Sequence, residues 1–138
     1  MRFTKGDDFI ELLFELETDS SLPSHADARV MTSLRASGFM GSATSHVDSH
    51  VLRRFSHDVR QLYTTLRGEA VLESMSPNEL RVTISAVDDV GHLVVHATIG
   101  KLVYGDYSRQ WHMVTGALDL EPSQLGSALA EEWLSNAG

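Results

Sequence analysis

Residues 51–95 read VLRRFSHDVRQLYTTLRGEAVLESMSPNELRVTISAVDDVGHLVV, and the period of the apolar residues changes within this stretch. Up to Gly68 the apolar residues recur three or four positions apart, which is the spacing of one face of an α-helix. Beyond Gly68 they alternate with polar residues, as in a strand with one buried face. A long amphipathic helix combined with such strands predicts the α+β class.

The predicted helix runs from about Val51 to Gly68. We expect Asp48 or Ser49 to cap its first turn, with Ser45 as an earlier candidate. Gly68 suits the left-handed residue that ends many helices. The apolar stripe, which we expect to face the core, consists of Val51, Leu52, Phe55, Val59, Leu62, Tyr63 and Leu66.

Three alternating segments precede the helix and predict three strands: Phe9–Glu17, Ala28–Ala36 and about Phe39–Val47. The residues between the first two are rich in turn formers and predict an exposed loop. Gly38 and Gly41 are expected to mark a bulge or a bend, because glycine inside a sheet often does so.

Four further strands are predicted after the helix, over Glu69–Ser74, Glu79–Val87, His92–Ile99 and Gln110–Leu120. The apolar residues change parity along the last of these, so Gly116 is expected to form a bulge there. A short C-terminal helix follows, capped near Glu121 or Ser123. Pro122 lies near its start, and its apolar residues Leu125, Leu129 and Trp133 are four positions apart.

These elements predict a single α+β domain over residues 1–138. Its core would be one twisted, mainly antiparallel sheet of about six to seven strands packed on the long helix, with a short C-terminal helix beside them. The strands and the long helix each have one apolar side, and this arrangement buries both.

Composition narrows the classes of function. The 138 residues carry 11 Lys and Arg against 19 Asp and Glu, a net charge of −8, and no cysteine. A negative field repels nucleic acid and anionic lipid, so neither is an expected partner. No signal-peptide pattern and no membrane-spanning run is seen, which makes the cytoplasm the expected location.

Histidine is the residue type that most invites a metal or ligand interpretation, because the chain has seven. His92 and His96 would lie on one face of a strand, but about 13 Å apart, too far to share an ion. His112, on the neighbouring strand, is a candidate to complete a ligand pocket with either of them. We expect no metal site and no cofactor. His46 and His50 have the four-residue spacing of zinc ligands on a helix, but Val47 takes the place of the HExxH glutamate and His57 is too far along the axis to share an ion.

No motif of a catalytic nucleophile or a phosphate-binding loop is present, so we expect no catalytic residues and no enzymatic activity. Glu11, Glu15 and Glu17 share one face of the first predicted strand. This acidic row is either a solvated face, a strand edge protected from aggregation, or a docking strip for a basic partner.

The order of these segments resembles small bacterial immunity-like proteins of polymorphic toxin systems. The resemblance rests on FIELLFELE, GFMG, the helix VLRRFSHDVRQLYTTLRG, the hairpin region EAVLESMSPNELRVTISAVDDVGHLVV and the short last helix. It implies a cytoplasmic protein that binds and blocks a cognate toxin domain. It implies no particular binding residue.

Three hypotheses of function follow. The first is a non-enzymatic inhibitor that masks a basic toxin domain, with the acidic row Glu11, Glu15 and Glu17 as the docking strip. The second is a small-ligand or metal-binding domain with a pocket around His92, His96 and His112. The third is a subunit of a homo-oligomer, joined through an exposed sheet edge.

Overall fold

The computed structural model describes residues 1–131, in which eight strands form two antiparallel sheets of four strands each. The first sheet contains, in order, β1 (Arg2–Lys5), β2 (Asp8–Leu16), β3 (Ala28–Ala36) and β4 (Phe39–Val47). The second contains β5 (Glu69–Glu73), β6 (Leu80–Ala86), β7 (Leu93–Tyr104) and β8 (Arg109–Leu120). Helix α1 (Ser49–Thr65) joins the sheets, and α2 (Pro122–Leu129) follows β8.

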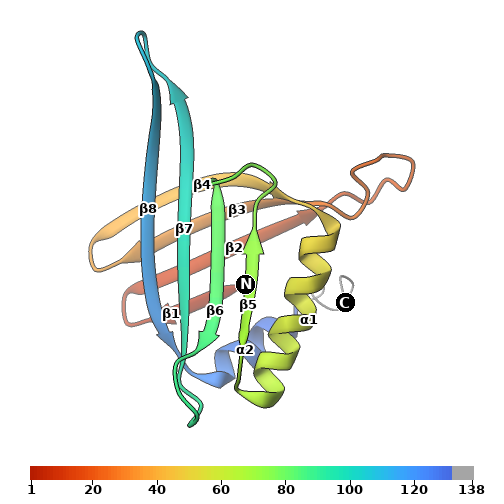
Figure 1. Ribbon diagram of the computed structural model, residues 1–138, viewed down its shortest axis with the longest axis vertical. Coiled ribbons are helices and arrows are strands. Elements are labelled where there is room, and N and C mark those ends of the chain that lie inside the picture. Colours follow the sequence, from red (N-terminus) through yellow and green to blue (C-terminus); the bar gives the residue numbers. More distant parts are fainter. Residues whose placement is uncertain (132–138) are drawn as a thin grey trace.

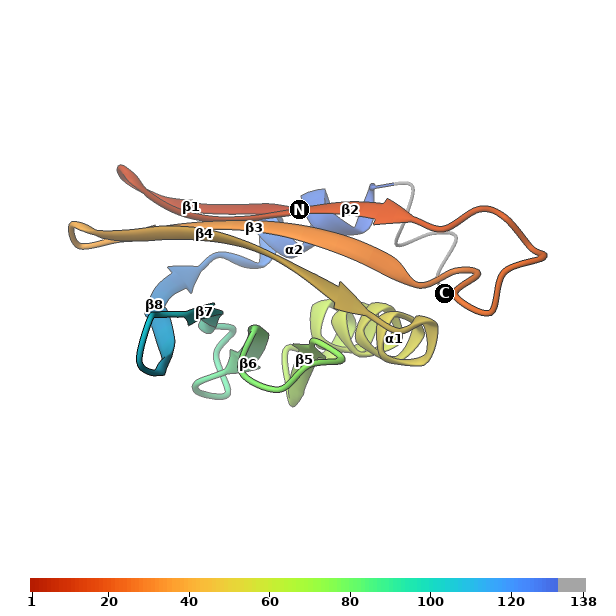
Figure 2. The same ribbon diagram turned by 90° about the horizontal axis from the view of Figure 1, so that it is seen from above.

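The α+β class is confirmed, but the expectation of one sheet of six to seven strands is wrong. The two sheets lie face to face, and their strands cross steeply (Figures 1 and 2). Each strand buries the face that points to the other sheet, so sheet-on-sheet packing produces the same alternation as a single sheet covered by a helix. Large fully buried side chains come from both layers, among them Phe3, Ile10, Leu12, Leu34, Leu72, Leu80, Ile84 and Leu93.

Helix α1 closes the open side of the sandwich next to β5, in the layer of the second sheet (Figure 2). The side chain of Asp48 caps it by accepting a hydrogen bond from the Val51 N–H at 2.9 Å. The helix ends at Leu66, which takes the left-handed conformation at φ 56°, two residues before the predicted glycine. The predicted stripe is confirmed at Leu52, Phe55, Val59 and Leu62, whereas Tyr63 is exposed.

Two glycines lie where the sheets are in close contact. The predicted bulge at Gly116 is wrong, because β8 pairs continuously with β7 and Gly116 lies opposite Ala97. A Cβ atom on Gly116 would lie 2.9 Å from the Cβ of Ala36, on the other sheet. Gly41 is also not a bend: it lies inside β4, and its Cβ would be 2.9 Å from Val114 Cγ2. The bend is the two-residue turn between β3 and β4, in which Ser37 and Gly38 both take positive φ, 50° and 87°.

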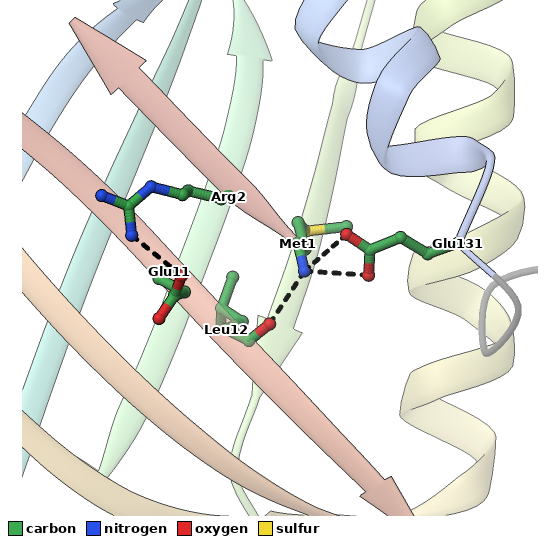
Figure 3. A network of polar contacts seen from close by, with 5 residues as sticks. All are labelled: Met1, Arg2, Glu11, Leu12 and Glu131. Carbon is green, nitrogen blue, oxygen red and sulfur yellow. Dashed lines mark hydrogen bonds and ion pairs between the residues drawn. The ribbon is translucent and has the colours of Figure 1, made fainter.

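The N-terminus is held in the interior (Figure 3). The Met1 ammonium donates to the backbone carbonyl of Leu12 at 2.9 Å and lies 2.6 Å from the carboxylate of Glu131. Helix α2 contains Pro122, Leu125 and Leu129, as predicted, and it buries Leu125. Trp133, also predicted to belong to this helix, lies outside the described residues. Within residues 1–131, neither helix has the length and apolar character needed to cross a membrane.

Candidate functional site

The distal halves of β7 and β8 form a two-stranded ribbon, residues 100–113, that projects beyond the rest of the sandwich (Figure 1). β6 pairs with β7 only as far as Leu80, opposite Ile99, so no third strand borders the ribbon beyond that point. The Gly100 N–H donates to the Glu79 carbonyl at 3.0 Å and fixes the ribbon where it leaves the sheet. We call residues 100–113 the distal ribbon.

The outer face of the distal ribbon carries large apolar side chains in contact with solvent. Trp111, Met113 and Tyr104 are 45%, 52% and 73% exposed, and Leu102, directly opposite Trp111, is half-buried. We call these four residues the ribbon face. Aromatic residues and methionine are enriched at protein interfaces, and a group of them on a projecting element favours partner binding.

The sequence contained a sign of the ribbon face, the parity of two apolar residues, but the parity alone predicted a bulge. Trp111 and Met113 have the opposite parity to the buried Leu118 and Leu120, and a bulge at Gly116 was the predicted reason. Because β8 is regular, the two residues instead point away from the first sheet. Apolar residues on the solvent face of a regular strand have no role in this core, which is why they mark a candidate interface.

The inner face of the distal ribbon overhangs β4 and encloses two adjoining hollows. The smaller, of about 260 Å³, is lined by Lys101 and His112, by the apolar residues Ile99, Val114 and Ala43, and by the chain at Met40 and Met113. The larger, of about 530 Å³, extends along Ser42 and Thr44 of β4 towards Glu79. Thr32, whose buried hydroxyl has no hydrogen-bond partner among the described residues, also lines the larger hollow. We call the two together the corner hollows.

The structure does not bring the three candidate histidines together. His96 lies on the outer face of the second sheet, opposite Ala117. His112 has the opposite parity to Ala117 on β8, so it lies on the inner face, where it pairs with Lys101. His92 precedes β7, at the other end of that strand from the distal ribbon.

His92 instead belongs to the turn between β6 and β7. Its ring Nδ1 contacts the Asp88 carboxylate, and this hydrogen bond raises the pKa of His92 above its ordinary value of 6.5. The attraction of Asp88 adds to the shift. The same hydrogen bond lowers the pKa of Asp88. Asp88 also accepts from the Val90 N–H at 2.9 Å, so the pair organises the turn.

The carboxylates of the acidic row all interact with neighbouring groups of the chain. Glu11 forms an ion pair with Arg2 at 2.8 Å (Figure 3), and Glu15 lies 3.4 Å from Arg29. Glu17 accepts a hydrogen bond from the Asp19 N–H at 3.0 Å. Cross-strand arginines therefore reduce the negative potential of this face, which weakens its attraction for a basic partner.

A further hollow, of about 370 Å³, lies between the loop after β2 and the start of α1. It is mostly apolar, with Leu16 and Leu52 among its lining residues, and His25 and Arg53 supply polar groups. None of His92, His96 and His112 is among its lining residues. The predicted small-ligand pocket around those histidines therefore does not coincide with this hollow.

Within residues 1–131, no group of three or more His, Asp and Glu side chains is placed to hold a metal ion. The distal ribbon is thus the feature of the described chain that most clearly lacks a structural role, because its ribbon face leaves apolar surface in water. Comparisons with models of protein families, with curated proteins and with solved structures found no match.

Proposed function

We propose that this chain is a non-enzymatic protein-binding domain, and that it acts as an immunity-type inhibitor by docking a cognate toxin domain on the ribbon face. The observation that carries the proposal is the exposure of Trp111, Met113 and Tyr104 on a ribbon that projects from the sandwich. Leaving such side chains in water forgoes the free energy of burial, which a partner would recover.

The charge of the chain supports a basic partner. A net charge of −8 would speed the encounter with a positively charged protein and slow the encounter with nucleic acid. The ribbon face itself is apolar, so we assign affinity to it and the association rate to the overall field. The acidic row remains a second candidate for the electrostatic contact, and the cytoplasm remains the proposed location.

Co-purification from the native host tests this proposal. The tagged wild-type chain, a Trp111→Ser/Met113→Ser variant and a control variant are purified at moderate salt, and the bound proteins are identified by mass spectrometry. Val87→Ser/Val90→Ser is a matched control, because these valines are 60% and 76% exposed at the opposite end of β7. We expect one stoichiometric toxin-like domain to be bound by the wild type and by the control. The Trp111→Ser/Met113→Ser chain, called the ribbon variant, should not bind it.

The same preparation separates the alternative functions. If the wild-type chain purifies without a partner but self-associates through the ribbon face, light scattering will show an oligomer that the ribbon variant lacks, and the homo-oligomer hypothesis replaces ours. A small molecule or metal retained in native mass spectrometry would favour the ligand-binding hypothesis. Capture of the partner by the ribbon variant would contradict the assignment of the ribbon face.

A further inference from the structure

The free edge of β4 exposes a row of backbone hydrogen-bonding groups. The His46 carbonyl accepts from the Met75 N–H at 2.8 Å, so the backbone groups of His46 point away from β3. Backbone direction alternates along a strand, and Met40, Ser42 and Thr44 therefore point their N–H and C=O groups the same way. Among the described residues, no hydrogen bond from another segment reaches these three positions.

The second sheet continues past the edge of the first. β4 is the last strand of its sheet, whereas the distal ribbon extends beyond it (Figure 1). The base of the ribbon's inner face borders the edge of β4, where Lys101 and His112 line a hollow with Ser42, and the ribbon then continues past that edge (Figure 1). The inner-face side chains of Lys101, Val103 and His112 are exposed or half-buried. A strand added to β4 would continue the first sheet and cover this face, because stacked sheets pack face to face.

The smaller corner hollow indicates the charge of the side chain that would enter it. Its two ionisable lining residues, Lys101 and His112, are both basic, and no carboxylate lines it. Glu79 lines only the larger hollow. Ile99, Val114 and Ala43 supply apolar surface around the two basic groups. The hollow thus fits a carboxylate carried on an extended, otherwise apolar or small segment.

We propose that the β4 edge is a strand-addition site, which receives an extended segment of the partner protein whose acidic side chain lies between Lys101 and His112. This inference rests on the proposed function, namely that the chain binds a protein. Main-chain hydrogen bonds to Met40, Ser42 and Thr44 would provide affinity, and the corner hollows would select the side chains. The partner would then hold both faces of the distal ribbon.

The probe for this site is the capped heptapeptide Ac-TVTETVT-NH2, added to the ¹⁵N-labelled chain and followed by two-dimensional NMR. We expect the largest shifts at the amides of Met40, Ser42, Thr44 and His112. The lysine counterpart Ac-TVTKTVT-NH2 should bind about fivefold more weakly, the scale of one exposed charge pair. No shift at millimolar peptide, or shifts centred on another strand edge, would overturn the proposal.

Two variants test the mechanism of binding. Ser42→Pro removes an outward N–H at an edge position, where proline is tolerated, and should abolish peptide binding. Ser42→Ala keeps the N–H and is the matched control, so it should bind as wild type does. Lys101→Glu should remove the preference for the glutamate peptide, and it keeps the proposal testable if Ser42→Pro does not fold. Equal binding by Ser42→Pro and Ser42→Ala would refute strand addition.

Failure of the strand-addition proposal is distinguishable from failure of the proposed inhibitor function. If Ser42→Pro still captures the partner whereas the ribbon variant does not, the ribbon face binds and the β4 edge is not used. If the wild-type chain captures no partner although the glutamate peptide binds along β4, the edge accepts strands but the inhibitor proposal fails.

Discussion

Gly100 allows the distal ribbon to leave the second sheet, and Gly100→Ala is the substitution that tests this most sharply. A Cβ atom at this position would lie 2.2 Å from the Asn78 carbonyl oxygen. That oxygen belongs to the backbone of a tight turn in which Asn78 has φ 71°, so it cannot rotate away as a side chain would. The turn or the strand must therefore move, which breaks the Gly100 N–H bond to Glu79.

The expected loss combines two contributions. Forcing an extra methyl group into a packed site costs about 1–3 kcal/mol, and the lost hydrogen bond costs about 0.5–1.5 kcal/mol. We expect Gly100→Ala to lower the free energy of unfolding by about 1.5–4.5 kcal/mol. At about 2.1 cal/mol/K for each of 138 residues, the entropy of unfolding is about 0.29 kcal/mol/K, so the thermal midpoint falls by about 5–16 °C.

Urea denaturation followed by tryptophan fluorescence and circular dichroism measures this loss. Gly41→Ala is the matched control, because its Cβ would meet only side-chain atoms, the nearest being Val114 Cγ2 at 2.9 Å. Val114 is half-buried and can adjust, so the control should lose about 1 kcal/mol. A loss below about 0.5 kcal/mol for Gly100→Ala would refute the close apposition of the ribbon and the 74–79 turn.

Three further predictions concern the core, the turn before β7 and the acidic row. Phe55→Ala should lower the free energy of unfolding by about 3–5 kcal/mol, because Phe55 is fully buried and leaves a cavity; a loss below about 1 kcal/mol in urea would contradict its place in the core. Asp88→Asn should return the pKa of His92 towards 6.5 in an NMR titration, and an unchanged value would disprove their pairing. The contribution of protonated His92 to the free energy of unfolding is complete below pH 6.5 and is lost as the pH rises through the raised pKa of His92. The contribution of ionised Asp88 is lost as the pH falls from 3.8 through the lowered pKa of Asp88. Reversing the acidic row to lysine should slow partner association and reduce its salt dependence in stopped-flow measurements, and an unchanged rate would exclude the row from the interface.

Local patterns in the sequence predicted the elements better than their assembly. Alternation predicted β2, β3 and β6 because each buries one side chain in two, and the three-four spacing predicted α1 through Phe55 and Val59. Alternation does not state what covers the buried face, so it did not distinguish one sheet from two. β1 was missed because four residues with one buried side chain, Phe3, form no period.

The candidate site was harder to predict because it depends on register. Nothing near Glu11 in the sequence shows that Arg2 lies opposite it, yet that pairing changes the charge of the face. The separation of His96 from His112 likewise follows from pairing between β7 and β8. Trp111 was visible as an apolar residue of the wrong parity, and only the regular course of β8 shows that it faces water.

The buried ammonium of Met1 has a practical consequence for every experiment described above. An affinity tag, a formyl group or an acetyl group on this nitrogen would turn a charged donor with three protons into a neutral amide with one. The amide cannot serve both the Leu12 carbonyl and the Glu131 carboxylate, and the attached group would enter a space in which the Met1 side chain is already fully enclosed. Tags therefore belong away from this nitrogen, and recombinant chains should be checked for complete deformylation by intact-mass spectrometry before any stability is compared.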